Sequence, residues 1–147
     1  MGDLVVQQFV SADGFAADDS GEFDLFEGVE GATADFDRGN SAWIDRVSAI
    51  LLGRNTYEQF VSFWPTDAAK GELVAAQINS VPKHVFSSSL TEAPWGEFEP
   101  ATVQSGDVVE DVRRLKSEMR GDLITQAEPR LLPGTSSAML DEVRSEQ

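Results

Sequence analysis

The stretch ILLGRNTYE, which runs from Ile50 to Glu58, carries the strongest structural signal in this 147-residue chain. Its first three residues form a short apolar run, which is typical of a strand covered on both faces. Gly53 then allows a tight turn and leaves no side chain in the way of a ligand. The residues that follow predict a helix, with Asn55 or Thr56 as its N-cap and an acid or amide three residues later to complete a capping box.

A junction of this kind can bind an anion. The start of a helix presents unpaired N–H groups and a partial positive charge, and Arg54 adds a planar fork of donors that matches phosphate geometry. A second predicted strand, Lys83 to Ser87, leads into a run of three serines that ends at Ser89. Both junctions suit a phosphate-bearing dinucleotide, although on spacing alone an ordinary turn with a solvated arginine explains the first one more simply.

The composition limits the classes of function. Apolar residues make up 41% of the chain, which is enough for one ordinary domain over residues 1–147. There are 26 acidic and 11 basic residues, and the net charge of −15 makes binding to nucleic acid unfavourable. The chain has no cysteine, which excludes disulfides, zinc–thiolate sites and thiol catalysis. No apolar run reaches the ~20 residues of a membrane span, and no basic-then-apolar leader is present, so we expect a cytoplasmic protein.

Strands and helices alternate along the chain. The apolar patterns predict strands at Leu4–Val10, Ala49–Leu52, Lys83–Ser87, Phe98–Val103 and Asp122–Thr125. Helices are predicted after Asn40 (with Trp43, Ile44 and Val47 on one face), at Asn55–Phe63, at Asp67–Asn79 and from an Asp107 cap to Gly121. A long loop is predicted at Ala16–Gly39, and a turn-rich link at Leu90–Pro100. This alternation predicts an α/β sheet with helices on both faces.

Four segments, taken together, resemble a known family. They occur in the order VQQFVSADG (Val6–Gly14), ILLGRNTYEQFVSFWP (Ile50–Pro65), PKHVFSSSL (Pro82–Leu90) and GDLI (Gly121–Ile124). Over about residues 3–125 the chain is similar to the dihydrofolate reductase-like proteins, of the type found as the C-terminal reductase domain of the bifunctional deaminase-reductase of riboflavin biosynthesis. The resemblance implies a mixed, mostly parallel sheet flanked by helices, and NADPH as the cofactor.

The resemblance also implies residues that would contact NADPH. Gly53, Arg54 and Thr56 would meet its phosphates, Ser87 and Ser88 would lie beside the adenosine 2′-phosphate, and Ala12 and Gly14 would approach the nicotinamide. The expected reaction is the reduction of a small heterocyclic substrate that is pterin- or pyrimidine-like. An acid could protonate the acceptor, and the candidates are Asp13, Asp24 and Asp37. Each of these carboxylates has a simpler interpretation as part of a solvated acidic surface.

The segment after Thr125 departs from the family pattern. Where the family has a glycine-containing turn against the pyrophosphate, this chain has Gln126–Arg130, with no glycine and with the carboxylate of Glu128, which would repel a pyrophosphate. Residues 126–147 are therefore expected to be an atypical, poorly ordered tail, and the family's last antiparallel strands to be missing. The alternative to a reductase is a non-catalytic ligand-binding or dimerisation protein that keeps the fold. An incomplete sheet leaves an open edge, so a homodimer is expected.

Three further patterns have both a chemical and a structural interpretation. The segment Asp18–Glu27 partly matches a calcium loop, but the first ligand position holds no oxygen and a strand precedes the loop where a helix is required. Trp43 and Trp64 could flank a planar substrate, and we expect Trp64 to form a pocket wall, although large aromatic side chains belong more often to a core. His84 has no second metal ligand near it in sequence, and we interpret it as a surface or hydrogen-bonded histidine.

Overall fold

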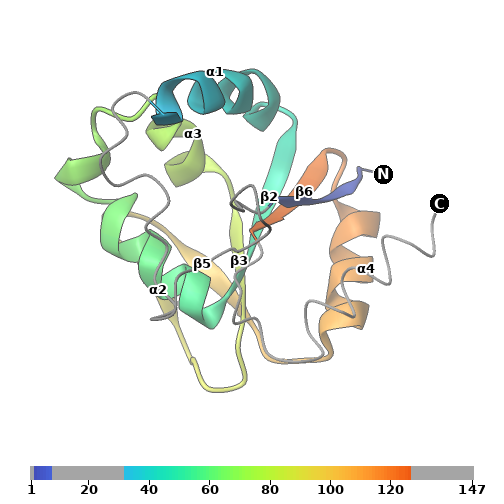
Figure 1. Ribbon diagram of the computed structural model, residues 1–147. Coiled ribbons are helices and arrows are strands. Elements are labelled where there is room, and N and C mark those ends of the chain that lie inside the picture. Colours follow the sequence, from blue (N-terminus) through green and yellow to red (C-terminus); the bar gives the residue numbers. More distant parts are fainter. Residues whose placement is uncertain (1, 8–31, 127–147) are drawn as a thin grey trace, which may run out of the picture.

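The computed structural model describes residues 2–7 and 32–126, and it arranges them as an α/β sheet with helices on both faces (Figure 1). The strands are β1 Leu4–Gln7, β2 Val47–Gly53, β3 Lys83–Phe86, β4 Ala93–Trp95, β5 Phe98–Gln104 and β6 Asp122–Gln126. The helices are α1 Ala32–Ile44, α2 Arg54–Phe63, α3 Ala75–Ser80 and α4 Val108–Glu118, with a 3₁₀ helix η1 at Asp67–Ala69. The predicted fold class is therefore confirmed.

The sheet is mixed and mostly parallel, as the resemblance implied. In the described part of the chain the strand order is β1-β6-β2-β3-β5-β4. All neighbouring pairs run parallel except β4 and β5, which pair antiparallel. The carboxyl ends of the parallel strands consequently meet at one edge of the sheet, the edge at which open α/β sheets bind their ligands. We call it the carboxyl edge.

The central strand β2 is buried on both faces, which explains why its sequence is apolar without alternation. Ile50 and Leu52 pack in one cluster with residues of α1, α2 and α3. Ala49 and Leu51 pack in a second cluster with Val112 and other residues of α4. Figure 1 shows α4 on the opposite side of the sheet from the other three helices.

A bulge near the start of β2 sets which side chains reach which face. The register against β6 shifts between Val47, which pairs with Asp122, and Ala49, which pairs with Leu123. Val47 and Ala49 would share a face in a regular strand, but the bulge places them in different clusters. Ser48, between them, accepts a hydrogen bond at Oγ from the backbone N–H of Gly121 at 2.8 Å, which ties the bulge to the turn before β6.

The prediction for the first helix is wrong in two respects. α1 already begins at Ala32, so the last part of the predicted loop Ala16–Gly39 is helical. Val47 does not lie on a helix face, because it is the first residue of β2. The β1 prediction is confirmed for Leu4–Gln7, and residues 8–10 lie outside the described part of the chain.

Two predictions between β2 and β5 are also wrong. The single helix predicted over Asp67–Asn79 is divided into η1 and α3, and Gly71, a poor helix former, lies between them. The link Leu90–Pro100 contains the unpredicted strand β4, whose central residue is Pro94. A proline argues against a strand except at the edge of a sheet, and β4 is an edge strand.

The helix predicted from Asp107 is confirmed as α4. The Asp107 side chain accepts a hydrogen bond from the backbone N–H of Glu110 at 3.0 Å, as expected for an N-cap. Val112 and Leu115 are buried against the sheet, with Val108 and Met119 packed beside them. Of the helices described here, none has both the length and the apolar content that crossing a bilayer requires.

Candidate functional site

The two junctions singled out from the sequence lie next to each other at the carboxyl edge. Gly53, the last residue of β2, pairs in register with Phe86, the last residue of β3. Arg54 and Ser87 therefore leave two hydrogen-bonded strands at the same level. Parallel pairing of β2 with β3 brings the glycine turn and the serine loop together.

Arg54 connects these two junctions directly. Its Nη1 donates to Ser89 Oγ at 2.8 Å, across 35 residues of sequence. Its Nε donates to Glu58 Oε1 at 2.8 Å, one turn further along α2. The side chain is 51% exposed, and these two bonds use two of the five N–H groups of a guanidinium. Within the described residues, Arg54 is thus held in place at the surface with donors left for an anion.

Helix α2 begins at this point without a side-chain cap. Its N-cap is Gly53, with extended backbone (φ −74°, ψ 166°), and its first turn carries no acidic residue. The predicted capping box at Asn55 or Thr56 is wrong, because the helix starts earlier, at Arg54. A helix start without a cap leaves N–H groups open to solvent or to an anion.

The serine loop after β3 is ordered by its own hydrogen bonds. Ser87 Oγ accepts from the backbone N–H of Ser89 at 3.2 Å and from that of Leu90 at 3.1 Å. The Ser87 backbone N–H donates to the carbonyl oxygen of Gln104, at the end of β5, at 3.0 Å. Ser88 is exposed at the tip. The loop therefore has a fixed backbone, with Ser88 and Ser89 accessible.

The remaining predicted cofactor residues are Thr56, Ala12 and Gly14. Thr56 lies in the first turns of α2 but is only 2% exposed. Ala12 and Gly14 lie outside the described residues, as do Asp13, Asp24 and the whole calcium-like segment. The structure thus brings together Gly53, Arg54 and the serine loop.

A cavity lies on the face of the sheet covered by α1, α2 and α3. Its volume is about 40 Å³, enough for a few water molecules, so a bicyclic ring could enter only if side chains moved. Most of the wall is apolar or aromatic, and the polar members are two glutamines and an asparagine. The lining residues are Gln7, Asn40, Trp43, Ile44, Ile50, Phe60, Val74, Ile78, Ile124 and Gln126.

The polar side of the cavity is a chain of three amides. Gln126 Nε2 donates to Gln7 Oε1 at 3.1 Å, and Gln7 Nε2 donates to Asn40 Oδ1 at 3.1 Å. Gln7 and Gln126 are paired last residues of β1 and β6, so this side also belongs to the carboxyl edge. Amides offer both donors and acceptors, and can therefore bind the ring nitrogens and carbonyls of a heterocycle.

The sequence analysis missed this amide chain. Gln7 and Gln126 were seen only as a strand residue and as the start of an atypical turn. Gln126 directly follows the predicted strand Asp122–Thr125, and this position was a usable signal, since ligands bind where parallel strands end. Gln7 lies inside the predicted strand Leu4–Val10, so no sequence signal marked it. Trp43 lines the cavity, in agreement with the interpretation that it could flank a planar substrate.

Trp64 is not among the residues that line this cavity. Its ring packs against Phe63, with centroids 5.1 Å apart, and against Phe60 at 6.2 Å. It belongs to the partly buried residues around the core cluster on this face. Trp64 therefore packs against neighbouring aromatic rings, and its expected role as a pocket wall stays a prediction.

His84 is hydrogen-bonded, as interpreted from the sequence. Its Nδ1 lies 3.0 Å from Gln104 Nε2. Burial, together with the nearby Arg114, lowers the pKa of His84 below its ordinary value of 6.5. Residues 2–7 and 32–126 contain no group of three or more metal-ligating side chains.

Comparison with known proteins finds similarity among solved structures. No family model matches the chain, and no curated protein is significantly similar to it. A solved structure does match. It is the crystal structure of a protein from Shewanella sp. PV-4 that is named as a riboflavin biosynthesis protein, and it has a TM-score of 0.62 at 27% sequence identity. The match covers 86% of this chain and 65% of the other, so this chain spans about two thirds of its neighbour's length. This similarity supports, in general terms, the resemblance of this chain to proteins of the riboflavin-biosynthesis reductase type.

Proposed function

We propose that this chain binds NADPH at the carboxyl edge and reduces a small heterocyclic substrate that is pterin- or pyrimidine-like. The observation that carries the proposal is the 2.8 Å hydrogen bond from Arg54 to Ser89. It joins a glycine turn, an uncapped helix start and a serine loop into one set of donors. Donors of this kind suit a phosphate group.

This donor set should favour NADPH over NADH, because it offers hydrogen-bond donors to the additional 2′-phosphate of NADPH. Gly53 and the start of α2 would receive the pyrophosphate, while Arg54, Ser87 and Ser88 would hold the 2′-phosphate. One residue opposes this arrangement, because the carboxylate of Glu58 already accepts from Arg54. Both side chains of that ion pair are about half exposed (51% and 52%), so the pair is weak and can rearrange.

The cavity would take the substrate ring. Trp43 and Phe60 supply aromatic surface, and Gln7, Asn40 and Gln126 supply donors and acceptors. The name of the structural neighbour makes the heterocycles of riboflavin biosynthesis the first class to test.

The chemistry needs little from the protein beyond orientation. NADPH supplies a hydride, which would add to a C=N or C=O carbon of the substrate while the nitrogen or oxygen takes a proton from an acid or from water. Ala12 and Gly14 would lie near the nicotinamide. Asp37, on α1 one turn before the cavity-lining Asn40, is the candidate acid that falls in a described helix.

A non-catalytic binding protein is the second candidate. The observation that favours it is that none of the described residues lining the cavity is ionisable. The unpaired side of β1, which pairs only with β6 within the described residues, would let either kind of protein form a homodimer through strand pairing.

Thermal unfolding with NADPH and with NADH tests the proposal. We expect NADPH to raise the melting temperature saturably and NADH to raise it much less. Arg54→Ala should remove the NADPH effect, and Arg54→Lys should restore only part of it, because lysine lacks the planar fork. Lys70→Ala is the matched control, since it removes one positive charge from an exposed ion pair with Asp67.

Two outcomes would contradict the proposal. One is the absence of any shift with millimolar NADPH. The other is an NADPH shift that Arg54→Ala and Lys70→Ala change equally, because the effect would then come from net charge. A shift with NADPH but no oxidation of it by any pterin or pyrimidine tested would favour the binding protein.

A further inference from the structure

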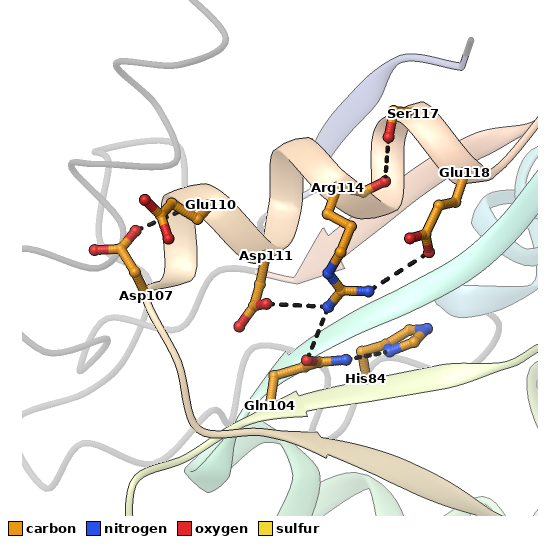
Figure 2. A network of polar contacts seen from close by, with 8 residues as sticks. All are labelled: His84, Gln104, Asp107, Glu110, Asp111, Arg114, Ser117 and Glu118. Atoms are coloured by element: carbon orange, nitrogen blue, oxygen red, sulfur yellow. Dashed lines mark hydrogen bonds and ion pairs between the residues drawn. The ribbon is translucent and has the colours of Figure 1, made fainter.

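A chain of polar contacts joins α4, β5 and β3 next to the serine loop (Figure 2). Arg114 Nη2 on α4 donates to Gln104 Oε1 at 3.1 Å. Gln104 Nε2 in turn lies 3.0 Å from His84 Nδ1. Arg114 is also held by Asp111 at 3.0 Å and by Glu118 at 3.5 Å.

The donors and acceptors of this chain fix one protonation state. A guanidinium can only donate, so it requires the oxygen of the Gln104 amide to face it. The NH₂ group of the amide must then face His84. Because that group is a donor, His84 Nδ1 has to be an unprotonated acceptor, and the ring has to be neutral.

Protonation of His84 would place two donors against each other. Rotation of the Gln104 amide by half a turn would satisfy the imidazolium, but it would turn the NH₂ group towards Arg114. The conflict would therefore move to the other end of the amide and would remain. A single amide cannot serve two cations.

Gln104 connects this conflict to the candidate site. Its backbone carbonyl oxygen accepts a hydrogen bond from the Ser87 backbone N–H at 3.0 Å. This bond lies at the point where β3 becomes the serine loop. A displacement of the Gln104 side chain that also shifts its backbone would therefore shift the loop that presents Ser88 and Ser89.

We propose that His84, Gln104 and Arg114 form a proton-sensitive latch that holds the Ser87–Ser89 loop in place while His84 is neutral and releases it when His84 is protonated. The latch concerns the loop itself. Its effect on nucleotide binding rests on the proposed function.

The surroundings of His84 set the direction of the pH dependence. The charged groups that face it come from α4 and are Arg114, Glu118 and Asp111. Its partners in the neighbouring strands are Leu51 of β2 and Thr102 of β5, neither of which titrates. Burial is the main reason that its pKa is lowered, and Arg114 adds to it, while the two carboxylates oppose it. The latch is consequently closed at neutral pH and opens as the pH falls below 6.5.

An NMR titration of the full chain without nucleotide tests the latch. His84 is the one histidine of the chain, so its ring signals identify themselves. We expect a neutral ring protonated at Nε2 at pH 7.5. On acidification, the Ser87 backbone amide and the Gln104 side-chain amide should shift with the same midpoint as the ring, below 6.5.

His84→Asn is the matched control, since the asparagine Oδ1 takes the place of Nδ1 and accepts without titrating. In this variant the Ser87 and Gln104 shifts should disappear over the same pH range. The proposal is overturned if Ser87 does not follow the His84 ring, or if its shift persists in His84→Asn and thus comes from the carboxylates of α4.

Gln104→Glu provides a second, independent test. A carboxylate can accept from both Arg114 and an imidazolium, so the titration midpoint of His84 should rise above its wild-type value and the Ser87 shift should shrink. An unchanged or lower midpoint would contradict the latch. Since none of these measurements uses a nucleotide, a failure of NADPH to bind would overturn the proposed function and leave this result standing.

Discussion

Glu58 competes with a phosphate for Arg54, and its removal should strengthen NADPH binding. In the structure Glu58 Oε1 accepts from Arg54 Nε at 2.8 Å, and both side chains are about half exposed. We consider Glu58→Gln, which keeps the shape and an acceptor but removes the negative charge. An exposed pair one helical turn apart contributes only ~0.3–0.5 kcal/mol, so the free energy of unfolding should change by less than that.

The effect on binding follows from the distance between the two anions. Two anions that each accept a hydrogen bond of about 2.8 Å from different N–H groups of one guanidinium are on the order of 6 Å apart, which sets the separation of a bound phosphate from the Glu58 carboxylate. Two unit charges at that distance repel by about 0.7 kcal/mol in water, and a phosphomonoester carries about −1.5 to −2. The repulsion is then roughly 1 kcal/mol, which corresponds to about a fivefold lower Kd for NADPH in Glu58→Gln.

Isothermal titration calorimetry with NADPH and NADH, at low and at high salt, measures this effect. The gain should be largest for NADPH at low salt and should shrink at higher ionic strength, because both groups are exposed. Glu97→Gln is the control, since it removes the same charge just before β5 begins, at the opposite edge of the sheet. An equal gain for NADH, an equal gain in Glu97→Gln, or no gain at all would refute the placement of the 2′-phosphate at Arg54.

Three further predictions concern stability. Asn79→Ala should lower the free energy of unfolding, measured by urea denaturation, by about 2–4 kcal/mol. Asn79 accepts from Trp95 Nε1 at 2.8 Å and donates to the Trp64 carbonyl at 2.9 Å, and both partners would lose a buried hydrogen bond. A loss no larger than that caused by Asn55→Ala, at an exposed position, would contradict this. Burial lowers the pKa of Lys83 to about 8 from 10.5. The unfolded chain therefore binds this proton more tightly than the folded chain does. Between pH 7.5 and 9.5 the free energy of unfolding should consequently rise by up to about 2 kcal/mol relative to that of Lys83→Met. A flat difference between the two proteins would show that the two carbonyls and the Trp95 ring around the ammonium offset its burial. Asp107→Ala should lower the free energy of unfolding by about 1 kcal/mol through loss of the α4 cap, and Asp107→Asn should restore most of it, as thermal unfolding would show.

Local patterns predicted those elements whose own residues dictate them. The apolar run at Ile50–Leu52 gave a strand buried on both faces because every one of its side chains can pack against a helix. Asp107 gave the start of α4 because its carboxylate reaches an N–H three residues away. Two other predictions failed because a distant contact outweighs local preference. β4 exists despite Pro94 because β5 pairs with it, and Val47 is a strand residue because β6 pairs with it.

The sequence by itself determined the kind of fold, the glycine junction and the serine loop, since turn chemistry and apolar periodicity act within a few residues. Only the tertiary structure decided that these two junctions meet, because the bond from Arg54 to Ser89 depends on β2 lying parallel beside β3. The same holds for the amides of Gln7 and Gln126, which are 119 residues apart and come together through the pairing of β1 with β6. Contacts between distant strands depend on strand order and register, which the packing of the whole sheet sets.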